Sequence, residues 1–199
     1  FNKEINSLDD IKGLKMRIPG VGGEVLKRAG GIPVTLPGGE LFTALQTGVI
    51  DATEWVGPYN DLTFGFHQIA KYYYYPGWHE PGSMLELLIN KDEWDQLPNH
   101  LKAIIETAAK AVNQDILDEY TAKNNSALRE LVDTHNVELR KLPDDVINEF
   151  KLIANQILEE NAKKDEMVNK VYQSYKSFKK DVSEYHKVSE DAFVEARNN

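Results

Sequence analysis

Short strand-like and helix-like segments alternate through the first ninety residues, and glycine or proline stands at nearly every junction between them. Alternating apolar side chains predict strands, whereas apolar side chains three and four residues apart predict helices. The expected strands are residues 14–18, 32–36, 49–56, 71–75 and 85–89, and the expected helices are residues 22–29 and 40–47. This order predicts an α/β fold with a mostly parallel sheet, because parallel neighbours need a crossover connection that is usually a helix.

The remainder of the chain is predicted to be mainly helical. Asn90, with Glu93 three residues later, is the expected N-cap of one long helix that continues to about His135. A short strand is expected at residues 137–142, where Pro143 ends it, and a further helix has an apolar face between residues 146 and 158.

The last segment carries a narrow apolar seam on an otherwise polar helix. Its members are three and four residues apart: Val168, Val171, Tyr175, Phe178, Val182 and Tyr185. Such a stripe is typical of a helix that lays one side on a partner. The pattern leaves open whether the partner is the helix's own domain or a second chain.

Composition excludes several classes of protein. The 199 residues carry a formal charge of −9, and no basic stripe that would suit nucleic acid is present. No apolar run approaches the roughly 20 residues of a membrane-spanning helix. The absence of cysteine excludes disulfides, thiolate metal sites and cysteine nucleophiles.

Because the chain begins with Phe1 and no signal peptide follows, we expect a fragment or a processed chain.

Arg17 is the first candidate for ligand binding. It lies between apolar neighbours near the end of an expected strand, and a glycine-rich turn and a helix follow. In open α/β sheets this end of a strand, facing a helix N-terminus, is where anionic ligands bind. A guanidinium can donate two parallel N–H bonds to a carboxylate. The alternative is a surface arginine in a salt bridge.

Two more strand ends carry acidic and aromatic side chains. Glu54 and Trp55 precede a Gly-Pro break, and Glu80 lies in a Pro/Gly-rich turn after four consecutive tyrosines, residues 72–75. Trp55 is alternatively a buried core residue with a chance acidic neighbour. If the strand ends converge, Arg17 holds a ligand carboxylate while Glu54 and Glu80 hold a metal ion. Oxygen ligands predict a hard cation such as Na⁺ or Ca²⁺.

No catalytic motif accompanies these residues. The sequence has no Gly-x-Ser-x-Gly, no His-Glu-x-x-His, no Walker loop and no dinucleotide fingerprint. His79 and Glu80 are not expected to act as an acid–base pair, because adjacent side chains on an extended chain point apart. The other histidines are expected to be structural or exposed: His67, His100, His135 and His186.

Three stretches resemble the substrate-binding proteins of TRAP transporters, of the DctP type. They are LKMRIPG at residues 14–20, FTALQTGVID at residues 42–51 and EWVGPYND at residues 54–61. The third resembles the branch that binds 2-oxo or 2-hydroxy monocarboxylates through a metal ion. The resemblance covers essentially the whole chain and corresponds to the C-terminal portion of these proteins.

The resemblance implies a fold and a set of roles. The fold would be a periplasmic-binding-protein-like lobe, with a long helix that crosses two lobes. Arg17 would pair with the substrate carboxylate. Glu54 and the main-chain oxygen of Trp55 would bind the metal ion, and Glu80 falls near another position expected to bind it. The expected partners are a small carboxylate, the membrane permease subunits of the transporter and a second copy of the chain that the C-terminal helix contacts.

The resemblance also implies a division of the chain. Residues 1–90 would form the ligand-binding lobe, residues 91–135 the crossing segment, residues 136–165 a strand and helix that return to the lobes, and residues 166–199 a dimerisation arm. The first lobe of the family would be missing, so half of the binding site would be absent and affinity reduced.

Three functions remain open on the sequence alone. The first is a periplasmic solute-binding protein that performs no chemistry. The second is a carboxylate-processing enzyme that uses Glu54 or Glu80 as a base and the metal as a Lewis acid. The third is an interaction module built on the terminal helix.

Overall fold

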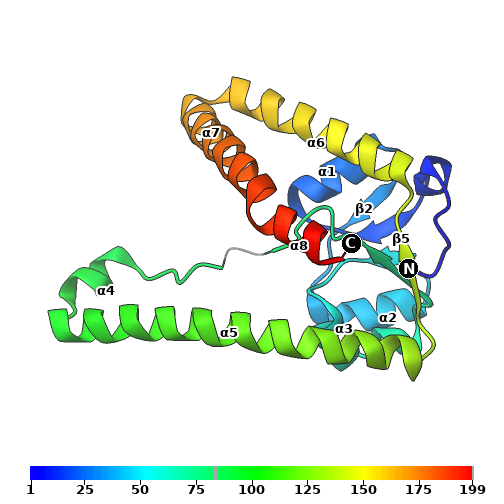
Figure 1. Ribbon diagram of the computed structural model, residues 1–199, viewed down its shortest axis with the longest axis horizontal. Helices are drawn as coiled ribbons and strands as arrows, with labels where there is room; N and C mark the ends of the chain where they lie inside the picture. Colours follow the sequence, from blue (N-terminus) through cyan, green and yellow to red (C-terminus); the bar gives the residue numbers. More distant parts are fainter. Residues whose placement is uncertain (83–84, 199) are drawn as a thin grey trace. The chain divides into compact units, whose positions relative to one another are not determined.

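The computed structural model describes residues 1–82 and 85–198 (Figure 1). These residues divide into two compact units, residues 1–148 and residues 149–199. The first unit contains every strand of the described residues, and the second is helical. The predicted α/β fold with parallel strands is confirmed.

The first sheet has three parallel strands in the order β2-β1-β3. They are β1 (Lys15–Arg17), β2 (Ile32–Val34) and β3 (Ala52–Thr53), each shorter than the sequence predicted. The crossover helices are α1 (Gly20–Arg28) and α2 (Leu41–Gln46), and α2 follows the short 3₁₀ helix η2 (Gly38–Glu40). The register pairs Arg17 with Val34 on one side and with Thr53 on the other.

The second sheet joins two strands that are far apart in the sequence. Strand β4 (Tyr72–Tyr75) pairs in parallel with β5 (Glu138–Lys141). The strand predicted at residues 85–89 is wrong, because residues 85–89 adopt no regular structure. Their apolar side chains face solvent, with Leu88 84% exposed. An apolar run forms a strand only where a neighbouring strand satisfies its backbone, and residues 85–89 pair with none of the described strands.

One core cluster is formed by α2 and the segments beside it. Leu41, Leu45 and Ile50 are almost fully buried, together with Phe66 of the 3₁₀ helix η3 (Phe66–Gln68). Trp55 packs against this cluster and is only partly buried. The core therefore supports the segment that follows β3, where the candidate site begins.

The predicted single helix from residue 90 to residue 135 is wrong, because it is interrupted. Asn90 does cap a helix, and its side chain accepts hydrogen bonds from the N–H groups of Asp92 and Glu93. That helix, α4 (Lys91–Gln96), ends before Pro98, and α5 (Asn99–Asp133) begins after it. Proline has no N–H to donate and its ring disfavours a helical residue before it, so the helix restarts there.

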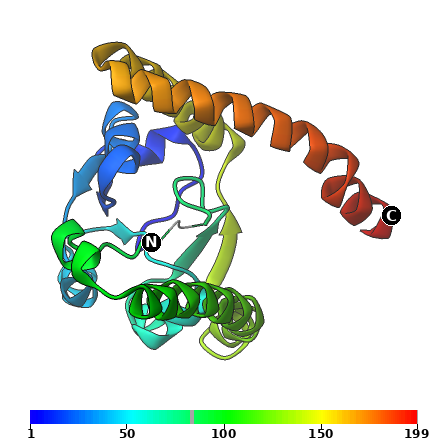
Figure 2. The same ribbon diagram turned by 90° about the vertical axis from the view of Figure 1, so that its left-hand side faces the viewer.

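Helix α5 lies beside α3 (Pro58–Thr63), and Figure 2 shows α5 almost end-on with α3 next to it. The N–H of Tyr59 donates to Asn124 Oδ1 at 3.0 Å, and the rings of Tyr59 and Tyr120 are 6.0 Å apart. The buried residues of α5 are Ala127 and Leu131, in its last two turns.

Three helices follow β5. They are α6 (Asp144–Lys164), α7 (Glu166–Val188) and α8 (Glu190–Asn198). One face of α6 is buried as predicted, with Phe150 3% exposed. Asp165 caps α7 by accepting a hydrogen bond from the N–H of Val168 at 2.9 Å. The predicted C-terminal helix is therefore two helices, α7 and α8, divided at Ser189.

Candidate functional site

The ends of two neighbouring strands bring Arg17 and Glu54 together. Arg17 is the last residue of β1, and Glu54 follows β3 directly. The N–H of Glu54 donates to the carbonyl oxygen of Arg17 at 3.3 Å, which continues the parallel ladder by one residue. Because both side chains leave the sheet at this edge, Arg17 Nη1 forms an ion pair with Glu54 Oε1. The side chains are 14% and 9% exposed, so the pair is largely shielded from water.

The Arg17 guanidinium is held in place by two further contacts. Its Nε donates to the carbonyl oxygen of Leu36 at 3.2 Å, and its central carbon lies 5.5 Å from the ring centre of Trp55. The Trp55 ring in turn rests on Gly38, where an added Cβ would lie 2.5 Å from the indole. Glycine at position 38 therefore makes room for the aromatic surface on which Arg17 lies.

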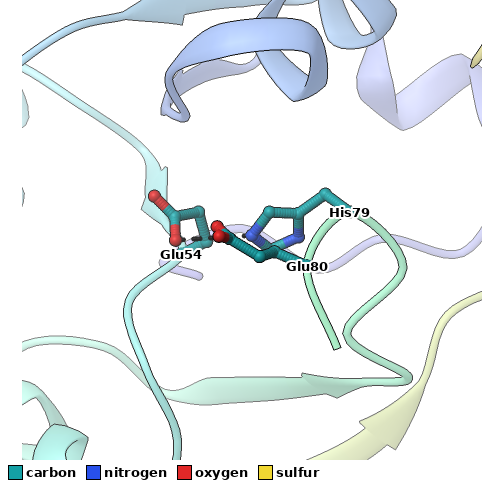
Figure 3. A group of neighbouring side chains, drawn as sticks. All are labelled: Glu54, His79 and Glu80. Carbon is teal, nitrogen blue, oxygen red and sulfur yellow. Dashed lines mark hydrogen bonds and ion pairs between the residues drawn. The ribbon is translucent and has the colours of Figure 1, made fainter. Parts of the chain in front are cut away.

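The loop after β4 supplies the other side of the site. Figure 3 shows Glu54 facing His79 and Glu80, which come from this loop. His79 Nε2 lies 3.3 Å from Glu54 Oε2. One potential ligand atom from each of Glu54, His79 and Glu80 lies within 4.8 Å of the other two. An added Cβ at Gly22 would lie 3.4 Å from that of His79, so the first turn of α1 borders the site.

His79 is a site residue that the sequence reasoning missed. On an extended chain, the side chains of residues 79 and 80 would point apart. The loop bends at His79 instead, so His79 and Glu80 converge on the same carboxylate. The available signal was the density of proline and glycine around this position, which is typical of a bent chain.

The donor atoms fit a small cation. Carboxylate oxygens from Glu54 and Glu80 suit the predicted Na⁺ or Ca²⁺, and the imidazole of His79 adds a nitrogen that suits borderline metals better. Arg17 forms an ion pair with one of the two carboxylates, that of Glu54. The role of the Trp55 main-chain oxygen stays a prediction.

Asp61, a buried carboxyl group near enough to sense the charge of Glu54, was also missed. Asp61 is 8% exposed, and Tyr73 Oη donates to its Oδ2 at 2.6 Å. Burial raises the pKa of Asp61 to about 6, and the charge of Glu54 adds to this rise while the Tyr73 hydrogen bond opposes it. Burial and the neighbouring carboxylate also raise the pKa of Tyr73. Asp61 and Tyr73 line a cavity of about 50 Å³, together with Trp55 and His67.

Among the remaining histidines, His67 and His135 stack with ring centres 4.0 Å apart, and neither contacts Glu54 in any interaction of the described residues. His100 lies on α5 and His186 lies on α7, and neither is a member of this group of described residues. The tyrosines of β4 have different surroundings. Tyr73 donates a hydrogen bond to the buried Asp61, whereas Tyr75 is 48% exposed.

The parallel sheet with a charged site at its carboxyl edge belongs to a known class of protein. Residues 1–165 match the family model described as bacterial extracellular solute-binding protein, family 7. The chain belongs to this family, the DctP family that its sequence motifs resemble. The family consists of solute-binding proteins of transporters and not of enzymes, so the enzyme hypothesis finds no support.

Particular relatives agree with this assignment. The chain is 43% identical over 190 residues to the monocarboxylate 2-oxoacid-binding periplasmic protein of Nostoc, covering 96% of this chain and 52% of that protein. A TRAP periplasmic solute-binding protein of Pseudoalteromonas atlantica, solved with sodium and pyruvate, matches with a TM-score of 0.92 and 41% identity. That match covers 98% of this chain and 59% of the solved one.

A TRAP solute-binding protein of Bordetella bronchiseptica matches with a TM-score of 0.92 and 34% identity, over 99% of this chain and 58% of the solved one. Its structure is a mixed-occupancy dimer with calcium and picolinate in the occupied site. The present chain thus spans little more than half the length of these relatives. None of the helices formed by residues 1–82 and 85–198 combines the length and the apolar character that a bilayer crossing requires.

Proposed function

We propose that this chain is the C-terminal portion of a periplasmic solute-binding protein that captures a small 2-oxo or 2-hydroxy monocarboxylate together with Na⁺ or Ca²⁺. The observation that carries the proposal is the meeting of Arg17 with Glu54, His79 and Glu80 at one edge of the first sheet. One guanidinium and a group of carboxylates form a site for an organic anion and its counter-cation. The relatives solved with sodium and pyruvate, and with calcium and picolinate, support the same chemistry.

The chemistry of a 2-oxo acid suits these residues. Its carboxylate and oxo oxygens stand on adjacent carbons, so both can bind one cation, and the carboxylate can also accept N–H bonds from a guanidinium. In this proposal Arg17 binds the carboxylate, and Glu54 and Glu80 bind the cation, with the main-chain oxygen of Trp55 as a further ligand. Trp55 also forms an aromatic wall under Arg17.

The captured anion is then delivered to the membrane subunits of a TRAP transporter in the periplasm. The names of the relatives, which are periplasmic binding proteins, support this location and these partners. In this proposal the ligand is bound and released without chemical change.

Isothermal titration calorimetry tests the proposal. Pyruvate and lactate are titrated into the chain in Na⁺, in Ca²⁺ and in a buffer whose only cation is tetramethylammonium. We expect binding of pyruvate that depends on the metal cation, and recovery of the acid unchanged after incubation. Acetate, which lacks the second oxygen donor, is the control ligand and should bind at least tenfold more weakly. Turnover of pyruvate, or equal binding of acetate, would contradict the proposal.

We further propose that two copies associate through the apolar seam of α7. The seam is exposed in the described chain, with Val171 61%, Phe178 69% and Tyr185 68% exposed. Apolar side chains at helical spacing on a solvated helix are typical of a surface that another helix covers. The dimer of the Bordetella relative supports a second copy as that partner.

A further inference from the structure

Arg17, which the ligand carboxylate would need, already has partners within the protein. Arg17 Nη1 is paired with Glu54 Oε1, and Arg17 Nε donates to the carbonyl oxygen of Leu36. A carboxylate that binds a guanidinium through two N–H groups uses either the Nε edge or the edge formed by Nη1 and Nη2. Each edge therefore already has one of its nitrogens in contact with the protein.

Charge also sets Glu54 against a ligand carboxylate at Arg17. Glu54 is 9% exposed, so its negative charge is weakly screened by water, and a ligand carboxylate on Arg17 would lie beside it. Two carboxylates that share one guanidinium repel each other unless another positive charge takes one of them. Glu54 is also a member of the group of three residues that suits a cation.

The second oxygen of Glu54 has its own contact. His79 Nε2 lies 3.3 Å from Glu54 Oε2, on the opposite oxygen from Arg17. The His79 side chain is 16% exposed, its ring centre lies 5.3 Å from that of Trp78, and it borders the first turn of α1. This contact uses the Glu54 oxygen that does not pair with Arg17, so it is compatible with loss of the Arg17 pair.

We propose that Glu54 and the ligand carboxylate compete for the Arg17 guanidinium, and that a cation bound at Glu54 decides the competition in favour of the ligand. Arg17 thus exchanges an internal partner for the ligand when the charge of Glu54 is taken over by the cation. The two ions then bind cooperatively, and each raises the affinity for the other by the same factor. The inference rests on the proposed function and adds to it the origin of the coupling.

Two substitutions separate this exchange from simple loss of a metal ligand. Glu54→Gln removes a cation ligand and also frees Arg17 from its ionic partner. Glu80→Gln removes a cation ligand and the same charge from the same group, but leaves the Arg17–Glu54 pair intact. Glu80→Gln is therefore the matched control for the effect of charge alone.

The affinity for pyruvate is measured for the wild-type chain and both variants, with and without Ca²⁺. In wild type we expect Ca²⁺ to tighten pyruvate binding by about tenfold or more, within the usual range of coupling between sites. Without Ca²⁺, Glu54→Gln should bind pyruvate about tenfold more tightly than wild type, whereas Glu80→Gln should stay within about threefold of it. Both variants should lose most of their dependence on Ca²⁺.

NMR provides a readout that needs no carboxylate. Ca²⁺ alone should shift the Nε–H signal of Arg17 and the indole N–H signal of Trp55, whose ring lies under the guanidinium. Glu54→Gln should show the shifted positions without Ca²⁺, and Glu80→Gln should show the wild-type positions.

The outcomes distinguish two failures. If wild type binds pyruvate with Ca²⁺ but Glu54→Gln without Ca²⁺ binds no more tightly than wild type without Ca²⁺, the exchange is wrong and the proposed function stands. Arg17 and Trp55 signals that stay unmoved at saturating Ca²⁺ would also overturn the exchange. If neither wild type nor Glu54→Gln binds pyruvate under any condition, the proposed function itself fails.

Discussion

Glu54 is a carboxylate whose neighbours define what the site does. It is almost buried, and its two oxygens face a guanidinium and an imidazole. A buried charge needs such partners, because removing one partner of a buried pair costs about 3–5 kcal/mol. Glu80, on the same loop as His79, adds a second carboxylate within reach of the same cation. Glu54 is therefore the side chain that connects the guanidinium with the group that suits a cation.

Replacement of Arg17 by lysine tests its role as the carboxylate partner. Lys keeps the positive charge but cannot donate two parallel N–H bonds, so we expect pyruvate binding to weaken by more than tenfold. The affinity is measured in this chain and in a fusion that places the first part of the Nostoc relative before Phe1. Arg28→Lys is the matched control, because Arg28 pairs with Glu24 on the surface of α1. Unchanged affinity in Arg17→Lys would make Arg17 a structural residue.

Asp61 is expected to make stability depend on pH. Burial raises its pKa from the usual 3.8 to about 6, so the folded protein holds this proton more tightly than the unfolded chain. Between pH 4 and pH 6 the unfolded chain loses its proton first, and the free energy of unfolding therefore falls as pH rises. The pKa difference corresponds to roughly 3 kcal/mol, reached above pH 6.

Chemical denaturation at pH 4 to 8 measures this effect. Relative to Asp61→Asn, whose amide oxygen can still accept from Tyr73, wild type should lose stability between pH 4 and pH 6 and then level off. Asp118→Asn, on the exposed surface of α5, is the control and should follow wild type at every pH. Parallel curves for wild type and Asp61→Asn would show that the Asp61 proton is not held more tightly in the fold.

At the scale of elements, the ends of strands and the breaks between helices place the functional side chains. β1 and β3 are neighbours in a parallel sheet, so Arg17 and Glu54 leave the sheet at the same edge although they are 37 positions apart in the sequence. The third contributor, the loop after β4, comes from a strand of the second sheet and bends at His79. A site built from two sheets depends on how the two sheets pack in the folded chain, and no single strand or helix determines that packing.

At the scale of the whole molecule, the chain consists of two compact units. It spans little more than half the length of its relatives. The candidate site lies entirely within the first unit, residues 1–148, whereas the seam of α7 lies in the second. Ligand capture and association of two copies are therefore proposed for different units.

Phe178→Asp tests the association of two copies. A charge in the middle of the apolar seam should weaken the dimer, since each buried aromatic side chain contributes about 1.5–3 kcal/mol and each copy supplies one. Light scattering coupled to size-exclusion chromatography should show a dimer for wild type and a monomer for the variant at the same concentration. Ser177→Asp, an exposed neighbour away from the seam, should remain dimeric. A monomeric wild type at tens of micromolar would refute the dimer.

Much of this protein follows from local sequence signals. The alternation of strands and helices, the parallel sheet and the strand ends that carry Arg17 and Glu54 were predictable, because glycine, proline and apolar spacing act over a few residues. Other features were decided by contacts between distant segments. Residues 85–89 have strand-like composition but no pairing partner among the described strands, and His79 reaches Glu54 only because its loop bends. Likewise, the pairing of Arg17 with Glu54 depends on which strands are neighbours, and backbone pairing between strands is settled by the folded chain as a whole.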